Sequence, residues 1–344
     1  MDVRLTTGLD YVAAVLHGRR SRMAEGDRLG VLAAERSIGD LARALYGETA
    51  ISSAVELQKR LVADRALEIL ELASKLDGPA GEFLGWLAVR FQVENLKVLA
   101  RGLAAGTPWS EVQAHLVPLP GKLAVDARAM ASEATVETLA GVIRQKPLAG
   151  ALVAALPLYQ AHPRAYFLES ALDRGYFVEL LARAGAVASE DLPDVLALVK
   201  QEIDIFHLVL VVRGKFLYGL PAEQVAPFYV PGARLRRPDF SAMLTATDLA
   251  EAAGRAVGFV IDAAPEAADP AAIERLAWDR YHRLAALVFR RSPAGLGLVA
   301  AYVALRRVEL ANLITASEGI RAGLSADDLR RRMIPRPEAE ARRV

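Results

Sequence analysis

The chain has 344 residues, of which 53% are hydrophobic and 24% are charged, so it carries ample apolar material for a sizeable core and too much for a disordered protein. Lys and Arg number 42 against 41 for Asp and Glu, a balance that argues against nucleic acid as the main partner. The absence of cysteine excludes disulfides, thiolate metal sites and a cysteine nucleophile.

No stretch of the sequence has the character of a membrane span. The N-terminal residues lack the apolar core of a signal peptide. The best candidate span, residues 292–305, is bracketed by Arg291 and Arg306 and is shorter than the ~20 apolar residues that a span requires. The next candidate, residues 148–158, is interrupted by Pro157. We expect a protein that, if it works at a membrane, does so from outside the bilayer.

Helical periodicity runs through almost the whole chain. Between residues 53 and 76, Val62, Ile69 and Leu76 fall on one apolar face, with charged residues on the other. Ser53 with Glu56 predicts a capping box at the start of this helix, and Gly78-Pro79 predicts its end.

Other stretches have the same pattern. They are residues 82–102, 192–212 and 271–289. No convincing run alternates as a strand would, and Ala and Leu dominate over β-branched and aromatic residues. The sequence therefore predicts an all-α fold.

The most informative feature is an internal repeat, found at residues 94–118, 206–231 and 311–335. Each copy contains a polar residue near its start, then a glycine, and finally a proline. The matched residues are Asn95, His207 and Asn312, then Gly106, Gly219 and Gly323, and then Pro118, Pro231 and Pro335. The intervals agree once a one-residue insertion is allowed after Gly214 in the second copy.

The repeat predicts that each copy ends in the same helical hairpin. A long helix ends at the glycine, a short helix begins after Thr107-Pro108, Pro221 or Ser325, and the proline prevents further helix. We therefore predict three helical modules, residues 1–121, 122–232 and 233–335, around a pseudo-threefold axis. A basic C-terminal tail follows at residues 336–344.

The sequence offers little reactive chemistry. The five histidines are scattered, with no pair at metal-ligand spacing, and each is more simply a structural or surface residue. Gly121-Lys122 and Gly214-Lys215 lack the flanking residues of a phosphate-binding loop, and no Gly-x-Ser-x-Gly motif occurs.

Several carboxylates lie within otherwise apolar helical stretches. They are Glu94, Glu202, Asp204 and Glu309. Two on one face could act as a general acid and base, but such residues more often face solvent, another helix or an interface. We therefore predict no catalytic, cofactor-binding or metal-binding residue.

Further motifs extend the pattern over nearly the whole chain. They are Tyr11 and Arg19 in the first helix, Val89-Arg90, Glu94-Asn95-Leu96, Leu119-Pro120-Gly121, Ala171-Leu172-Asp173-Arg174-Gly175-Tyr176-Phe177, Phe228-Tyr229-Val230-Pro231-Gly232, Gly297-Leu298-Val299 and Gly323-Leu324-Ser325. In order and spacing they resemble the C subunit of bacterial and archaeal V/A-type ATPases (ATP synthases), a family that includes the d subunit of eukaryotic V-ATPases. The sequence departs from the repeat at His207, where an asparagine is expected, and at Glu318, where the first two copies have an arginine.

The resemblance implies a funnel-shaped, non-catalytic central-stalk protein without a cofactor. Its socket would receive the rotor axle made of the D and F subunits, and its opposite face would dock on the cytoplasmic loops of the proteolipid c-ring. It would thus be a peripheral protein at the cytoplasmic face of the membrane, coupling ATP hydrolysis or synthesis to proton or sodium transport. Torque transmission needs a stiff body and two large interfaces rather than a reactive group.

Two other functions are compatible with parts of the sequence. A generic helical-repeat scaffold also stacks helical hairpins, but such proteins use units of 33–47 residues, much shorter than the interval here. An all-α enzyme of unrecognised type would require carboxylates or histidines that converge in one deep pocket.

The polar residues that recur at matched positions are candidate contacts for the axle socket. They are Asn95, Arg101, His207, Arg213 and Asn312. For Asn95 and Asn312, a buried packing role is an equally good hypothesis.

Overall fold

The computed structural model describes residues 3–47, 50–126, 128–188, 190–264 and 269–335. Six helices in this part of the chain have 20 or more residues: α4 (Ala54–Ala73), α5 (Gly78–Ala105), α10 (Ala165–Gly185), α11 (Leu192–Val211), α15 (Pro270–Arg291) and α16 (Leu296–Arg321). The others are α1 (Val3–Arg20), α2 (Gly26–Leu32), α3 (Ile38–Tyr46), α6 (Trp109–His115), α7 (Ala129–Ser132), α8 (Val136–Gly141), α9 (Lys146–Ala161), α12 (Ala222–Val225), α13 (Arg237–Thr245), α14 (Leu249–Ala256) and α17 (Ala326–Arg332), with the short turns η1 (Gly121–Leu123), η2 (Val212–Leu217) and η3 (Ala226–Phe228).

The prediction of an all-α fold is confirmed. The described residues form no β-strand, and their extended pairing is limited to an isolated bridge between Val257 and Ile261. The four helices expected from periodicity correspond to α4, α5, α11 and α15. None of the described helices is both long and apolar enough to cross a bilayer. The expected basic tail, residues 336–344, lies outside the described residues.

The ends of α4 differ from the prediction. Ser53 takes the N-cap position, but its side chain accepts no hydrogen bond from the first turn, so the capping box with Glu56 is wrong. Ser53 is exposed, where water can satisfy the same groups. The helix ends at Ala73, and Gly78 and Pro79 instead open α5, because proline fits the first turn of a helix without losing a hydrogen bond.

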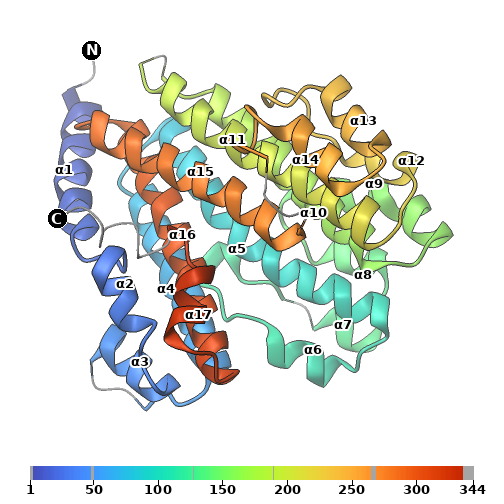
Figure 1. Cartoon of the computed structure of the whole chain (residues 1–344), viewed down its shortest axis with the longest axis horizontal. Coiled ribbons are helices and arrows are strands. Elements are labelled where there is room, and N and C mark those ends of the chain that lie inside the picture. The colour runs from blue at the N-terminus through green and yellow to red at the C-terminus, as the bar shows by residue number, and fades with distance from the viewer. Residues whose placement is uncertain (1–2, 48–49, 127, 189, 265–268, 336–344) are drawn as a thin grey trace.

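The six long helices pack as three hairpins, α4–α5, α10–α11 and α15–α16. Each hairpin also packs against the next one, α5 on α10 and α11 on α15, and α16 returns to pack on α4 (Figure 1). The first and last hairpins are therefore neighbours although they lie at opposite ends of the sequence. One large cluster of buried apolar side chains extends through all three hairpins, and a smaller cluster joins α2 and α3 to α4, α16 and α17.

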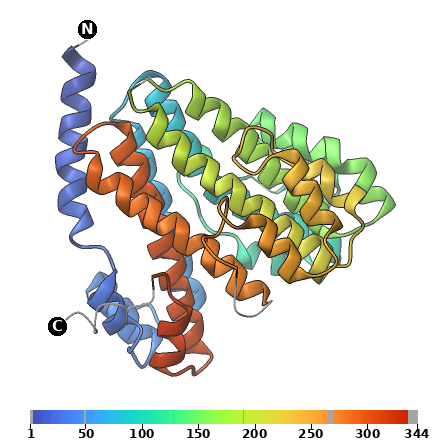
Figure 2. The same ribbon diagram turned by 45° about the horizontal axis from the view of Figure 1, so that its top comes forward.

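The shorter helices cover the outside of this arrangement. Helix α1 lies along one edge against α16, α8 and α9 pack on α5 and α10, and α13 and α14 pack on α11. Figure 2 shows α1 standing beside the α15–α16 hairpin.

The second long helix of each hairpin (α5, α11 with its continuation η2, and α16) ends at the predicted glycine. Gly106, Gly219 and Gly323 have φ of 62°, 64° and 70°, the left-handed conformation that side chains rarely adopt. In each copy the next N–H bonds back to the carbonyl of a matched glycine inside the helix. These pairs are Thr107 to Gly102 (2.9 Å), Leu220 to Gly214 (2.8 Å) and Leu324 to Gly319 (2.9 Å).

The second copy accommodates its extra residue by a local change in helix type. The end of its long helix, Val212–Leu217, is a π-helix, which holds one residue more than the equivalent α-helical turn. The inserted residue is therefore absorbed inside the helix, and the glycine still reaches its position. This explains why the sequence repeat needs an insertion after Gly214.

A short helix follows each hairpin (α6, α12 and α17), and it packs directly on the matched glycine of the long helix before it. A Cβ atom built at Gly102 would lie 2.4 Å from a methyl group of Val112, and one at Gly319 would lie 2.0 Å from a methyl group of Leu329. At Gly214 the same Cβ would meet Tyr166 and Val225 at 2.4 and 2.8 Å. Only glycine allows this close approach.

We expect Gly102→Ala to lower the free energy of unfolding by about 1–3 kcal/mol, because the added methyl group must displace Val112 in a packed core. Gly85→Ala is the matched control on the same helix, since its Cβ would meet nothing within 4 Å, and it should stabilise the chain by about 0.5–1 kcal/mol. Urea unfolding followed by circular dichroism measures both. Equal effects of the two substitutions would contradict the packing argument.

Candidate functional site

Two matched asparagines tie the long helix of their hairpin to the chain in front of the proline. The side-chain amide of Asn95 donates to the carbonyl oxygen of Val117 (2.8 Å), and its oxygen accepts from the Val117 N–H (2.9 Å). Asn312 makes the same two bonds with Ile334, at 2.7 and 3.0 Å. Both asparagines are buried. Their side chains thus have a packing role within their own copy of the repeat.

In the second copy of the repeat, His207 makes one of these two hydrogen bonds. Its Nε2 accepts from the Val230 N–H (2.9 Å), and its ring stacks on Tyr229 at 4.7 Å between centroids. Its Nδ1 has no hydrogen-bond partner among the described residues. Burial lowers the pKa of His207 to about 3, so the imidazole is neutral at physiological pH. The departure from asparagine therefore removes one hydrogen bond and adds aromatic packing.

The two predicted arginines each reach the neighbouring hairpin. The guanidinium of Arg101 lies 2.7 Å from Glu169 of α10, and that of Arg213 lies 3.4 Å from Glu274 of α15. The arginine side chains are 54% and 51% exposed. They therefore remain accessible from outside while they bridge consecutive hairpins.

The third copy makes the equivalent contact with the polarity reversed. Glu318, which stands where the other copies have arginine, accepts a hydrogen bond from Gln58 of α4 (2.6 Å). Gln58, Glu169 and Glu274 each lie four residues after the first residue of their helix. The two departures from the repeat, a glutamate for arginine and a glutamine for glutamate, thus compensate each other across one contact.

A cavity of about 260 Å³ lies between the hairpins, and every one of the six long helices contributes to its wall. Much of the wall is built from matched positions. Leu87, Val199 and Ala304 lie eight residues before the polar residue of their copy, and Arg90, Glu202 and Arg307 lie five residues before it. Arg65, Tyr176 and Tyr281 are matched on the first helix of each hairpin. We call this space the central cavity.

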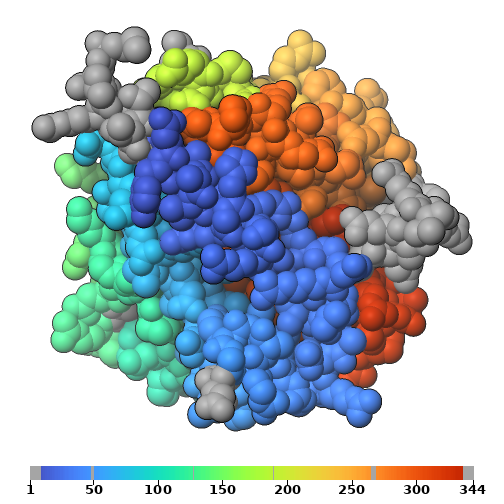
Figure 3. All heavy atoms as spheres, turned by 90° about the vertical axis from the view of Figure 1, so that its left-hand side faces the viewer, coloured from blue at the N-terminus to red at the C-terminus, as the bar shows by residue number. Residues whose placement is uncertain are grey.

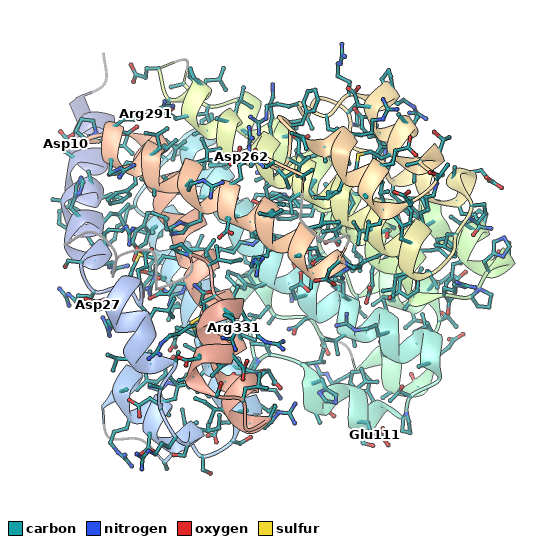
Figure 4. All side chains as sticks on the ribbon, viewed as in Figure 1. Asp10, Asp27, Glu111, Asp262, Arg291 and Arg331 are labelled. Atoms are coloured by element: carbon teal, nitrogen blue, oxygen red, sulfur yellow. The ribbon has the colours of Figure 1, made fainter. Side chains whose placement is uncertain are left out.

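None of the five predicted socket residues is among those that line the central cavity. The three buried ones stabilise the hairpins, and Arg101 and Arg213 lie at contacts between hairpins. Charged residues elsewhere, such as Asp10, Asp27 and Glu111, lie at the outer edge of the molecule (Figure 4).

The charged groups in the central cavity are paired. Arg307 forms an ion pair with Glu202, which also accepts from the Tyr281 hydroxyl (3.3 Å). Arg90 contacts Glu94 (2.8 Å) and Asp173 (2.6 Å). A buried charge without a partner would destabilise the fold strongly, so these pairs are a condition for placing charges here.

One carboxylate and two tyrosines of the central cavity have shifted pKa values. Burial alone raises the pKa of Glu94, but Lys97 and Arg90 lower it to about 2. Its side chain is enclosed by protein on several sides yet remains 49% exposed, since it borders the open cavity. Burial, and then the charge of Glu202, raise the pKa values of Tyr176 and Tyr281. Glu94 is thus ionised and the tyrosines are neutral, a state suited to holding a shape rather than to transferring protons.

The residues that the structure describes contain no group of three or more His, Cys, Asp or Glu side chains that could hold a metal ion.

The model of the ATP synthase (C/AC39) subunit family matches residues 12–332. The chain belongs to this family. The resemblance seen in the sequence is thereby confirmed over nearly the whole length.

This chain is similar to proteins from archaea and bacteria. The C subunit of an A-type ATP synthase from Methanosphaera stadtmanae is 23% identical over 319 residues, covering 88% of this chain and 81% of the relative. Its counterpart from Methanothermobacter thermautotrophicus is 24% identical, covering 65% and 60%. The C subunit of a V-type ATP synthase from Deinococcus radiodurans is 27% identical, covering 74% and 68%.

Sequence reasoning missed the charged wall of the central cavity. Glu202 stood out only as a carboxylate in an apolar helix. The signal that could have found the others is the repeat itself, since Arg90, Glu202 and Arg307 share one position in the three copies. An ionisable residue at the same place in three buried helices indicates a common polar environment.

We expect the stability difference between the wild type and His207→Asn to depend on pH. The folded imidazole stays neutral down to about pH 3, whereas the unfolded one binds a proton below about pH 6.5. The unfolded state thus binds more protons in this window, and wild-type stability falls as the pH falls by up to about 1.4 kcal/mol per pH unit. The variant lacks this contribution.

At pH 7.5 the His207→Asn protein should be less stable than the wild type, because it loses the stacking on Tyr229. The difference in the free energy of unfolding between the two proteins should narrow or reverse by pH 5. Burial raises the pKa of nearby Asp204 to about 6, which acts in the opposite direction but is present in both proteins. Urea unfolding of both proteins from pH 5 to 8 measures the difference, and a constant gap would contradict the assignment.

Proposed function

We propose that this chain is the non-catalytic central-stalk component of a rotary V/A-type ATPase. It would join the rotor axle, made of the D and F subunits, to the membrane c-ring while ATP hydrolysis or synthesis is linked to proton or sodium transport. Membership of the C/AC39 family supports a place in an ATP synthase complex. The observation that carries the coupling role is the central cavity, whose wall takes matched residues from all three hairpins.

The proposal includes a funnel of three modules, residues 1–121, 122–232 and 233–335, around a pseudo-threefold axis. Its support is the recurrence of the same contacts. The bonds of Asn95 and Asn312 match within modules, and the contacts of Arg101, Arg213 and Glu318 match between them. The packing of α16 on α4 closes the series.

In this proposal the central cavity is the floor of the axle socket. An α-helix with side chains is about 10–12 Å across, so a cavity of about 260 Å³ admits the side chains at the tip of an axle rather than a length of helix. Among its lining residues, Ala311 is exposed and Phe91, Val117 and Ile314 are partly exposed. These apolar groups form a suitable entrance for an apolar tip.

The five residues predicted from sequence then divide into two roles. Asn95, His207 and Asn312 would hold the socket frame from within the modules, as their hydrogen bonds suggest. Arg101 and Arg213 would be free to contact the axle because half of each side chain is exposed. The opposite face would dock on c-ring loops, placing the protein at the cytoplasmic face of the membrane.

We expect Ala311→Trp to weaken binding of a purified D–F complex at least tenfold, because the indole would fill the entrance of the central cavity. Ala322→Trp is the matched control on an exposed position outside the cavity lining and should bind as the wild type does. Calorimetry or surface plasmon resonance measures the affinity, and thermal unfolding checks that both variants fold. Unchanged binding by a folded Ala311→Trp protein would discard this socket.

We expect charge reversal at Arg101 and Arg213 (R101E, R213E) to weaken D–F binding with little loss of stability. Each arginine is half exposed and its ion pair contributes at most about 1 kcal/mol. Reversal of Arg43, an exposed arginine of α3 paired with Asp40, is the control. Binding equal to the control would remove the two arginines from the interface.

A further inference from the structure

A second cavity, of about 320 Å³, lies where the first and last hairpins meet, and arginines dominate its lining. We call it the junction pocket. Its charged lining residues are Arg19, Arg22, Arg28, Arg65, Arg306, Asp64, Glu68 and Glu309. They come from α1 and the turn after it, α2, α4 and α16. Five guanidiniums thus stand against three carboxylates in the lining, an excess of two positive charges.

Two carboxylates of the junction pocket are buried and already engaged. Glu68 accepts hydrogen bonds from Arg19 (3.2 Å), Arg306 (3.1 Å) and the Tyr302 hydroxyl (2.6 Å), and it also pairs with Arg65. The side chain of Glu68 is 12% exposed. Glu309 accepts from the Ala24 N–H at 2.6 Å and pairs with Arg306. These two carboxylates are therefore saturated with donors.

The third carboxylate, Asp64, lies 3.8 Å from Arg60, which is not part of the lining. Adding Arg60 to the charges of the lining would therefore raise the positive excess rather than lower it.

Donor capacity remains unused in the same pocket. Arg65 is 7% exposed, and its Nε has no hydrogen-bond partner among the described residues. Arg22 and Arg28 are exposed, and neither forms an ion pair with any described carboxylate, although Arg28 donates to the Arg22 carbonyl. One buried and two exposed guanidiniums thus border the same space with donors to spare.

We propose that the junction pocket binds a phosphate-bearing dianion, either inorganic phosphate or a phosphomonoester group. Guanidinium donors match phosphate oxygens in pairs, and this geometry favours arginine over lysine. A charge of about −2 equals the excess of the lining. The cavity volume is also ample for one phosphate group with water.

The position of the site gives the bound anion a structural role. Figure 3 shows α1 and the segment after it spread over the face that the first and last hairpins share. Arg19, Arg22 and Arg28 belong to that N-terminal segment, whereas Arg65 and Arg306 belong to the two hairpins. An anion held by both groups clamps the N-terminal segment onto the one hairpin contact that joins the two ends of the sequence.

The equivalent contact between α11 and α15 shows what the junction pocket adds. Asp204 there matches Glu309 and likewise accepts a backbone N–H, from Leu235 at 2.9 Å. Its arginine, Arg234, bonds to Asp204 (3.4 Å) and to the carbonyl of Phe259 (2.9 Å). The matched position of Arg65 is Tyr281. The arginine excess is thus a property of the contact between the last and first hairpins and not of every copy.

The test measures phosphate binding to the full chain by isothermal titration calorimetry and by the shift of the thermal midpoint. Sodium chloride at equal ionic strength is the reference. The double variant Arg22→Gln/Arg28→Gln should bind phosphate at least tenfold more weakly, and it should fold because both side chains are exposed. The control Arg36→Gln/Arg43→Gln removes two exposed arginines outside the pocket and should bind as the wild type does.

Two further arms identify the source of the phosphate group. AMP tests a soluble phosphomonoester, and vesicles of phosphatidylcholine with or without phosphatidic acid test a lipid headgroup. Binding in any arm that depends on Arg22 and Arg28 supports the site, and the arm names the ligand. Binding that is equal in both double variants, or no binding in any arm, overturns it.

Hydrogen exchange gives an independent readout of the clamp. The bound ligand should slow amide exchange in residues 19–28 at least severalfold in the wild type and leave it unchanged in the Arg22→Gln/Arg28→Gln variant. Slower exchange spread evenly over the chain would contradict a local clamp.

Discussion

The hydrogen bonds between a buried polar side chain and the backbone in front of a proline set the geometry of the hairpin modules. Asn95 and Asn312 are buried, and each satisfies both the N–H and the carbonyl of one residue. The returning segment is thereby held at a fixed distance from the long helix. The short helix then has to pack on that helix, and only a glycine at the contact allows the approach that the structure shows.

Similar hairpins lead to similar contacts between them. The end of each long helix reaches the start of the next hairpin, through Arg101 and Glu169, Arg213 and Glu274, and Glu318 and Gln58. In the third contact the long helix supplies the acceptor, Glu318, and the next hairpin supplies the donor, Gln58, which reverses the roles in the other two contacts. The same pair of positions is therefore in contact in all three copies, although the residue types differ in the third.

The charges within the central cavity suit a rigid body. Glu202 pairs with Arg307 and Glu94 pairs with Arg90; although burial raises the pKa of Glu94, Lys97 and Arg90 lower it to about 2. A protein that transmits torque in the proposed manner benefits from a wall that keeps its shape. The junction pocket differs, because its five arginines outnumber its three carboxylates and the Nε of Arg65 has no acceptor among the described residues. The partners proposed for the two cavities, an apolar protein tip and a small anion, differ accordingly.

The sequence by itself determined the all-α fold, the glycines at which three of the long helices end and the presence of three copies of the repeat. These features follow from local rules: helical periodicity, the left-handed turn at Gly106, Gly219 and Gly323, and the proline that prevents further helix. The one-residue insertion after Gly214 was visible too, although only the structure showed that a π-helix absorbs it. Local rules failed at Gly78-Pro79, where one signal fits either the end of a helix or the start of the next, and at Ser53, which takes the N-cap position without the expected side-chain hydrogen bond.

Only the tertiary structure decided which matched polar residues face the central cavity. Asn95, His207 and Asn312 lie five residues from Arg90, Glu202 and Arg307, which places the two sets on different faces of the same helices. Periodicity shows that a residue is on an apolar helix, but which neighbour it meets depends on how the hairpins pack. The junction pocket is the extreme case, because Arg22 and Arg306 are brought together by a contact between the two ends of the chain. No local pattern carries that information, since it arises when the last hairpin packs on the first.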